Sequence, residues 1–411
     1  MDAEIHDELR AVARDLLGKA GPAGRPDWQL LAGAGWPGLE VPGALDGADA
    51  TFAETAVILA ELGRAAARSP YLGIVVLGIG TLTQLEPAPD RDKLLREAAT
   101  GAGAPVAALA DGDDESGTSA PFRIERSARG LRLHGRAAFV PDAAQASRLL
   151  LLALDPGGVP VIADVEPHAP GLGVAAQPVL DATRRLALVT ADNVEVRQTS
   201  VWRFAGDPQG TIRRLLDRAA VAVACDSLGL SEAMLAATVA YAKVREQFGR
   251  PIGSFQAVKH ACADMLVQVS VARELVAQAV SQLAENDPHA TVAASMAKSH
   301  ACGTAVDVVG KAMQLHGGMG YTWESGVHVY LKRAALNRSL FGSPAAHRRR
   351  LAGRYLAQST VLAKPTVIAR SGQLPAARLA FASSPAGTSP TRTTECPSSS
   401  RPNTSGQISQ H

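Results

Sequence analysis

The sequence has 411 residues and a mass of 42.6 kDa, enough for roughly two to three domains of about 150 residues each. Hydrophobic residues make up 46% of it and charged residues 19%, which excludes a disordered, collagen-like or coiled-coil protein. The 41 Lys and Arg nearly balance the 39 Asp and Glu, and aromatic residues are only 4%, so we expect no nucleic-acid partner.

The first region, residues 1–104, is predicted to be helical. Apolar residues recur at helical spacing from Ile5 to Leu17 and again from Phe52 to Leu62. Between these stretches, residues 32–43 are rich in Gly and Pro, which forbids a continuous helix and predicts a connecting loop.

The second region, residues 105–204, is predicted to be a β domain. Short apolar runs with β-branched residues alternate with turn signals. The stretch from Arg123 to Val140 is typical of a hairpin that turns at Ala128-Arg129-Gly130. No helical pattern separates the runs, which argues against a doubly wound sheet.

The third region, residues 205–365, is predicted to be a helical bundle. The helical period returns and is interrupted at Gly249 to Ser254, at Asn286-Asp287-Pro288 and at Gly317-Gly318. Residues 366–411 are dominated by Ser, Thr, Pro and Gly toward their end, so we expect a disordered tail.

Cysteine spacing and apolar windows predict the localisation. The four cysteines, at positions 225, 262, 302 and 396, form no CxxC pair, which is typical of a reducing compartment rather than a zinc or disulfide framework. The chain starts with an acidic amphipathic stretch, and no window of about 18 apolar residues is expected after it. We therefore expect a cytoplasmic protein without a membrane span.

Two glycine-containing breaks in the bundle are candidates for ligand binding. Arg245-Glu-Gln-Phe-Gly249 places Arg245, Gln247 and Phe248 at a helix C-terminus beside a tight turn, where a guanidinium can bind an external anion through two hydrogen bonds. Leu315-His-Gly-Gly-Met-Gly-Tyr321 leaves backbone N–H groups open to a ligand. The alternatives are a solvated charged face and a plain helix stop.

These two segments, within an α-β-α chain, resemble the acyl-CoA dehydrogenase family over about residues 1–360. The first continues through Pro251-Ile-Gly-Ser-Phe-Gln256, and Glu61-Leu-Gly-Arg64 resembles the family's N-terminal domain. The segment after Tyr321 is most similar to a bacterial, especially actinobacterial, branch.

The resemblance implies a fold and a cofactor. The fold would be α+β, with an N-terminal helical domain, a middle β-barrel-like domain and a C-terminal four-helix bundle, assembled as dimers or tetramers. FAD would lie between the middle domain, the bundle and a neighbouring subunit. The residues implied in FAD binding are Arg245 at the pyrophosphate, Gln247 and Phe248 at the adenosine end, and Gln314, Gly317 and Gly318 reaching the dinucleotide from a neighbouring chain.

The resemblance also implies a reaction, for which this chain lacks the usual base. Family members convert an acyl-CoA thioester to the 2-enoyl-CoA with a glutamate base, and electron-transfer flavoprotein is the implied acceptor. The two usual glutamate positions match Phe341 and Ala219 here, and neither side chain can accept a proton.

Three carboxylates remain near the helix of Ala219, namely Asp217, Asp226 and Glu232. Asp226 follows Ala219 by about two turns and shares its face, whereas Asp217 lies roughly 160 to 200° away. Asp226 is therefore the candidate base, with a local hydrogen-bonding role as the alternative.

The middle region departs from the family pattern as well. The loop expected to touch flavin and thioester reads Asp111-Gly-Asp-Asp-Glu-Ser-Gly117, and the strand expected to face the flavin ring reads Phe139-Val-Pro141. Pro141 has no N–H to donate. Steroid or other bulky acyl groups are the substrates that the resemblance implies.

Four hypotheses follow. The chain is a subunit of a heteromeric acyl-CoA dehydrogenase, in which it is the weakly catalytic or non-catalytic member. It is a self-sufficient dehydrogenase with Asp226 as base. It is a flavin monooxygenase on the same fold, or a structural relative without FAD.

Overall fold

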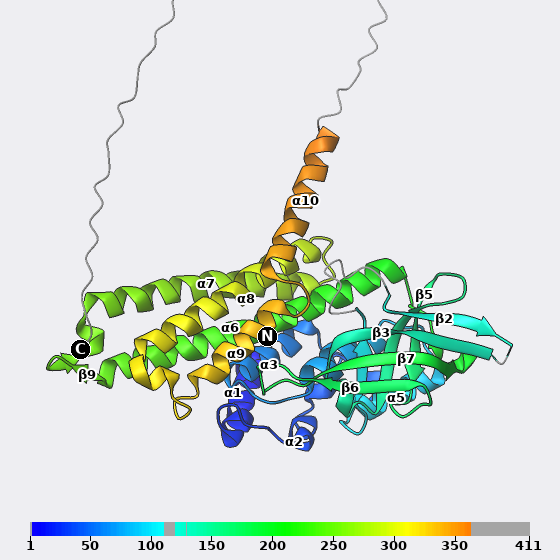
Figure 1. The fold of residues 1–411 in the computed structure, drawn as a ribbon, viewed down its shortest axis with the longest axis horizontal. Coiled ribbons are helices and arrows are strands. Elements are labelled where there is room, and N and C mark those ends of the chain that lie inside the picture. Colours follow the sequence, from blue (N-terminus) through cyan, green and yellow to red (C-terminus); the bar gives the residue numbers. More distant parts are fainter. Residues whose placement is uncertain (1, 111–119, 129, 363–411) are drawn as a thin grey trace, which may run out of the picture. The chain divides into compact units, whose positions relative to one another are not determined.

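The computed structural model describes residues 2–110, 120–128 and 130–362. The loop Asp111–Gly117 and the tail 366–411 lie outside the described residues. Within the described residues, helices come first, strands follow and long helices come last, as the sequence predicts (Figure 1). The predicted fold class is confirmed.

Two of the N-terminal helices begin at residues that commonly start helices. Thr51 caps α3 through a capping box with Glu54, and Pro89 occupies the first turn of α5. The helix at 72–79 is a π-helix, a rare form often found at functional positions. The elements are α1 (Asp2–Ala20), α2 (Trp28–Gly33), η1 (Trp36–Gly38), η2 (Gly43–Leu45), α3 (Phe52–Arg64), η3 (Leu72–Ile79), α4 (Gly80–Leu82) and α5 (Pro89–Ala99).

The middle strands form one eight-stranded, mostly antiparallel sheet. The strand order is β6-β7-β3-β2-β4-β5-β8, with β1 parallel to β4. The predicted hairpin is confirmed, since β2 and β3 pair antiparallel from Phe122 opposite Gly135 to Ser127 opposite Gly130. The strands are β1 (Pro105–Ala108), β2 (Phe122–Ser127), β3 (Gly130–Pro141), β4 (Arg148–Leu154), β5 (Pro160–Val165), β6 (Leu172–Gln177), β7 (Leu186–Val196) and β8 (Val201–Trp202), with the short helices η4 (Ala143–Gln145) and η5 (Gln198–Ser200).

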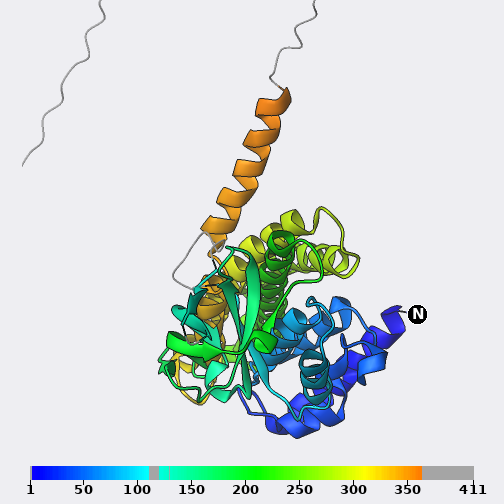
Figure 2. The same cartoon turned by 90° about the vertical axis from the view of Figure 1, so that its right-hand side faces the viewer.

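The C-terminal region consists of long helices separated near the predicted breaks. Asp207 caps the first of them, and α10 projects away from the other helices (Figures 1 and 2). The prediction that Gly249 ends the first of these helices is wrong, because the helix ends at Val244 and residues 246–251 form a short antiparallel hairpin, so that Gln247 and Phe248 lie in this hairpin and only Arg245 caps the helix. The elements are α6 (Pro208–Val244), β9 (Glu246–Gln247), β10 (Arg250–Pro251), η6 (Ile252–Ser254), α7 (Gln256–Ala284), α8 (Ala290–Leu315), η7 (Gly317–Tyr321), α9 (Val327–Ser339) and α10 (Pro344–Leu362).

Helix α6 is the central element of the core. By length and composition it could cross a membrane, but 78% of its apolar window is buried inside the fold. The expectation that no such window exists is wrong, because many alanines and few charges make this helix apolar without a continuous run of large side chains. Its burial is that of a core helix in a bundle.

Two glycines let α3 approach α6 closely. A Cβ added at Gly63 would lie 2.0 Å from the Asp226 carbonyl oxygen, and one at Gly229 would lie 1.9 Å from the Ala60 oxygen. The two backbones therefore touch, and the carboxylate of Asp226 lies where the N-terminal helices, the sheet region and the bundle meet. One continuous hydrophobic core runs through all three regions.

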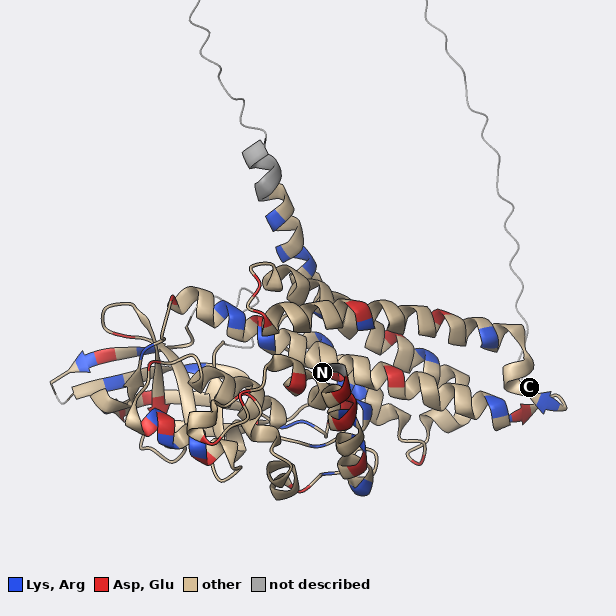
Figure 3. Ribbon diagram, turned by 180° about the vertical axis from the view of Figure 1, so that it is seen from behind, with Lys and Arg blue, Asp and Glu red and all other residues tan. Residues whose placement is uncertain are grey.

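Charged residues of both signs are interspersed over the described part of the chain (Figure 3). The exception is α10, where Arg348, Arg349, Arg350 and Arg354 are exposed and no acidic residue occurs.

Candidate functional site

The two glycine-containing breaks lie at the same end of the bundle. Tyr241, in the last turn of α6, stacks on His316 at the end of α8, with ring centroids 4.5 Å apart and an interplanar angle of 21°. Its hydroxyl also donates to the His316 carbonyl at 3.4 Å. The fold thus brings together two motifs that are about 70 residues apart in the sequence, as one candidate site.

Arg245, Gln247 and Phe248 are all exposed at this end. The Arg245 backbone N–H closes the last turn of α6 by donating to Tyr241, but no ion pair joins its guanidinium to another described residue. Phe248 is 91% exposed in a left-handed conformation (φ 53°), a backbone geometry that is uncommon for a bulky residue and concentrated at functional sites.

In the second motif, Leu315–Tyr321, the backbone has free space beside two of its glycines. A Cβ added at Gly317 or Gly318 would meet nothing within 4 Å, and Gly317 has a φ of +59°. Gln314 is exposed one turn earlier, and Tyr321 and Trp323 are 72% and 79% exposed beside it. A guanidinium that forms no ion pair with the described residues can bind a pyrophosphate, open space beside two glycines lets a ligand approach the backbone, and exposed aromatic rings can stack on a base. These residues therefore fit FAD.

Neither of the two positions that the resemblance matches to the family's glutamates carries a proton acceptor. Ala219 is fully buried in α6, and Phe341 is half-buried in the loop between α9 and α10. Phe341 has a φ of +55° and Gly342 a φ of +94°. The loop therefore keeps an unusual backbone conformation while presenting a benzyl group in place of a carboxylate.

Buried polar residues hold this loop. Lys298, fully buried, donates from Nζ to the carbonyl oxygens of Asn337 and Arg338 at the end of α9, at 2.9 and 3.2 Å. His347 Nε2 lies 2.9 Å from the Phe341 carbonyl oxygen and must donate to it. Burial lowers the pKa of His347 to about 4, so the imidazole is neutral at pH 7.

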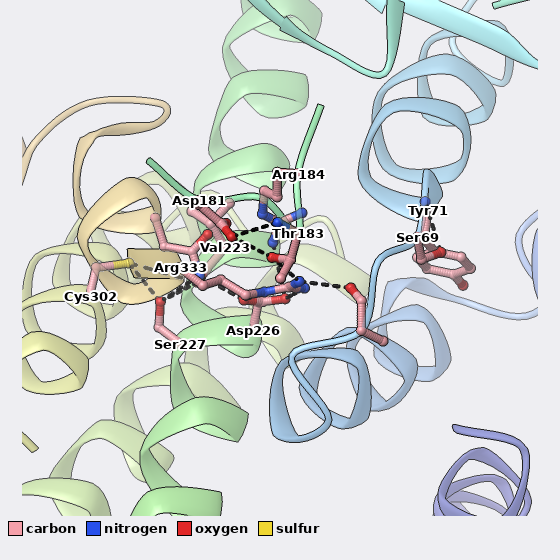
Figure 4. Close-up of polar contacts among 12 residues, drawn as sticks. Ser69, Tyr71, Asp181, Thr183, Arg184, Val223, Asp226, Ser227, Cys302 and Arg333 are labelled. Atoms are coloured by element: carbon pink, nitrogen blue, oxygen red, sulfur yellow. Dashed lines mark hydrogen bonds and ion pairs between the residues drawn. The ribbon is translucent and has the colours of Figure 1, made fainter. Parts of the chain in front are cut away.

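Asp226 lies far from the exposed end, in a buried ion cluster (Figure 4). Since Arg245 follows it by 19 helical residues, the two lie about 28 Å apart along α6. Its carboxylate accepts two hydrogen bonds from Arg333, at 2.9 and 2.5 Å, one from Asn337 at 2.7 Å, and an ion pair from Arg184 at 3.0 Å. Burial by itself raises the pKa of Asp226, but Arg333 and Arg184 outweigh it and lower the pKa to about 2.

This environment favours a structural role for Asp226 over proton abstraction. A base needs a free oxygen and a pKa near the operating pH, whereas both oxygens here are held by cations. The hydrogen-bonding role that the sequence left open is thus real, although Asp226 bonds to distant helices rather than locally.

Asp226→Asn separates these two roles. We expect the free energy of unfolding to fall by about 3 kcal/mol, because the substitution leaves two arginines buried without their counter-charge. Urea denaturation measures this, with Glu232→Gln on the same helix as the control, where a partly exposed pair is worth about 0–1 kcal/mol. A base would instead show lost flavin reduction at unchanged stability.

The strand predicted to face the flavin ring ends in a strained segment. Phe139 has a φ of +55°, and its N–H donates to Gln177 Oε1 at 2.6 Å. Asp142, one residue beyond Pro141, accepts from the Gly73 N–H at 3.1 Å in the first turn of η3. Burial raises the pKa of Asp142 to about 7, against the opposing effect of Arg184.

Asp142 therefore predicts a pH dependence of stability. Folding raises the pKa of Asp142 from 3.8, so the buried carboxyl group is favoured in its protonated form. The free energy that this protonation adds to the stability of the fold is fully present below about pH 4 and is lost as the pH rises through about 7. We expect Asp142→Asn, which keeps an acceptor for Gly73, to remove this loss. Thermal melts from about pH 5 to about pH 8 measure it, and parallel curves for the two proteins would contradict it.

Sequence reasoning missed Arg333, Asn337, Lys298 and His347. Arg333 and Asn337 are four residues apart and share a helix face, but nothing local shows that this face is buried. A partner more than 100 residues away decides their role.

Comparisons with known proteins identify the family of this chain. Residues 210–356 match the model of the acyl-CoA dehydrogenase C-terminal domain. The chain is 33% identical to acyl-CoA dehydrogenase IpdE2 of Mycobacterium tuberculosis over 335 residues, 79% of this chain and 85% of that protein.

Solved structures share the whole described fold. A variant of the Tcur3481–Tcur3483 steroid ACAD is 28% identical with a TM-score of 0.76, covering 88% of this chain and 100% of that one. The ChsE4–ChsE5 complex from Mycobacterium tuberculosis is 24% identical with a TM-score of 0.75, covering 86% and 97%, which shows a common fold.

Proposed function

This chain belongs to the acyl-CoA dehydrogenase family of oxidoreductases, and we propose that it is the FAD-binding, base-lacking subunit of a heteromeric acyl-CoA dehydrogenase. The complex would convert an acyl-CoA to the 2-enoyl-CoA. The proposal rests on Phe341 and Ala219, which occupy the two positions that the resemblance matches to the family's glutamates and which carry no proton acceptor.

The exposed end of the bundle supports FAD binding. Arg245 would pair with the pyrophosphate, Gln247 and Phe248 would contact the adenosine end, and the amides after Gln314 would approach the dinucleotide of a neighbouring chain. When bound, FAD supplies the two-electron acceptor of the reaction. The chain's own contribution is to bind and orient it.

Known relatives support a two-chain enzyme. The Tcur3481–Tcur3483 steroid ACAD and the ChsE4–ChsE5 complex each combine two different chains by name. By that likeness we propose a second acyl-CoA dehydrogenase chain as partner, a steroid-type or other bulky acyl-CoA as substrate, and electron-transfer flavoprotein as acceptor.

Co-expression tests the proposal. The chain is produced with and without a second acyl-CoA dehydrogenase chain that keeps glutamate at the position of Phe341, and oligomer mass and FAD per chain are measured. We expect a mixed dimer or tetramer that oxidises acyl-CoA. A homo-oligomer of this chain that turns over acyl-CoA at the same rate would reject it.

A further inference from the structure

Few contacts join the described strands of the sheet to the bundle helices. The strands contact the bundle helices chiefly where β5 meets α6. The N-terminal helices, in contrast, pack broadly against both the bundle and the sheet. On one side α3 packs along α6, and on the other η3 packs under β1. The sheet is therefore attached firmly to η3 and loosely to the bundle.

One buried guanidinium joins all three regions. Arg333, on α9, is 2% exposed and binds Asp226 of α6 through two nitrogens. Its Nη1 donates to the Ala67 carbonyl, between α3 and η3, at 2.7 Å, and to the Thr183 hydroxyl, between β6 and β7, at 3.0 Å. Figure 4 shows Arg333 between Asp226 and Thr183.

A second arginine completes the attachment from the sheet side. Arg184 follows Thr183 and pairs with the same carboxylate, Asp226 Oδ2, at 3.0 Å. Asp181 orders this segment by accepting from the Thr183 N–H and hydroxyl at 2.8 and 2.6 Å. The sheet thus reaches the bundle through one charge-assisted hydrogen bond, from Arg333 to Thr183, and one ion pair, between Arg184 and Asp226. A hydrogen bond has a fixed direction, unlike apolar contacts, which can slide.

We propose that Asp226, Arg333, Arg184 and Thr183 form a latch that fixes the sheet against the bundle, and that the sheet rotates as a unit about η3 when the latch is cut. A rigid body held by one broad and one narrow attachment is the arrangement of a hinge. The latch sets the spacing of any ligand site that draws residues from both regions. The latch would hold the sheet in the same way whether or not the chain has a catalytic base of its own.

A distance measurement between spin labels tests the latch in the full chain. Cysteines replace the exposed Val159, between β4 and β5, and the exposed Gln278 of α7. Cys262 is changed to Ala and Cys396 to Ser, while the buried Cys225 and Cys302 remain. Labelled chain is mixed with an excess of unlabelled chain, so that double electron–electron resonance reports distances within one chain.

With the latch intact we expect one narrow distance distribution. Arg333→Met and Arg184→Gln should each broaden it and shift it to longer distances, while circular dichroism stays unchanged. The matched control is Arg273→Met, which removes an arginine that donates through two nitrogens to one oxygen of another α6 carboxylate, Glu232, at a more exposed position. It should leave the distribution narrow.

A wild-type distribution in folded Arg333→Met and Arg184→Gln would overturn the latch. If Arg333→Met does not fold, the double variant Thr183→Val with Arg184→Gln decides alone, because it leaves the Arg333–Asp226 pair in place and removes both contacts from the sheet's side. Broadening in the Arg273→Met control to the same extent would equally reject a specific latch.

Discussion

Arg333→Met is expected to lower the free energy of unfolding by about 3–5 kcal/mol, a larger loss than we expect from any other substitution in the buried ion cluster. Methionine fills a similar volume, so packing changes little. The loss comes from the hydrogen bonds to Asp226, Thr183 and Ala67 and from a carboxylate left with one cation in the interior. Urea denaturation followed by circular dichroism measures it.

Arg333→Lys and Arg273→Met are the controls for this result. Lysine keeps the charge but cannot make the fork of hydrogen bonds, so we expect it to recover only part of the loss. Arg273→Met should cost no more than about 1 kcal/mol, because its pair with Glu232 is partly solvated. If Arg273→Met and Arg333→Met lowered the free energy of unfolding equally, the buried ion cluster would contribute no more to stability than a partly exposed pair.

Arg245→Ala is expected to weaken FAD binding by roughly 10- to 100-fold, because a charge-assisted hydrogen bond is worth about 1.5–3 kcal/mol. The guanidinium has no ion pair with the described residues, so its removal should not unfold the chain. Equilibrium dialysis against FAD measures the affinity, and the melting temperature of the FAD-free chain should stay the same.

Arg250→Ala is the matched control for Arg245→Ala. Arg250 lies in the same hairpin, and its guanidinium packs over the Phe255 ring at 4.2 Å. Its removal should change FAD affinity little. An Arg245→Ala protein that binds FAD as tightly as wild type would reject the assignment of this end of the bundle to the dinucleotide.

Local signals in the sequence predict most of the fold. The breaks at Asn286 and Gly317 end helices in the structure, because asparagine and glycine just past a helix end adopt the left-handed conformation. Gly249 instead lies in the turn of the β9–β10 hairpin, after α6 has already ended at Val244. The hairpin turn at Gly130 is equally local. The exposed residues of the candidate FAD site could be identified in the same way, since their motifs lie within single turns.

The buried ion cluster around Asp226 could not be predicted, because the role of each of its residues depends on partners that are distant in the sequence. Helical spacing places Asp226 on the face of Ala219, but it carries no information about Arg333, 107 residues later, or about Arg184 from the sheet region. The sequence alone does not distinguish an aspartate that is paired with two arginines in the fold from one that has no such partners. The same reason hides Lys298, whose partners are backbone carbonyls of another helix.

Whether this chain binds FAD but lacks its own base is tested most directly by anaerobic titration. The purified chain is titrated with short-chain, long-chain and steroid-type acyl-CoA thioesters while the flavin absorbance is followed. We predict that bound flavin stays oxidised when the chain is alone and bleaches when the partner chain is added. Stoichiometric bleaching by the chain alone would contradict the proposed role and require a working base within it.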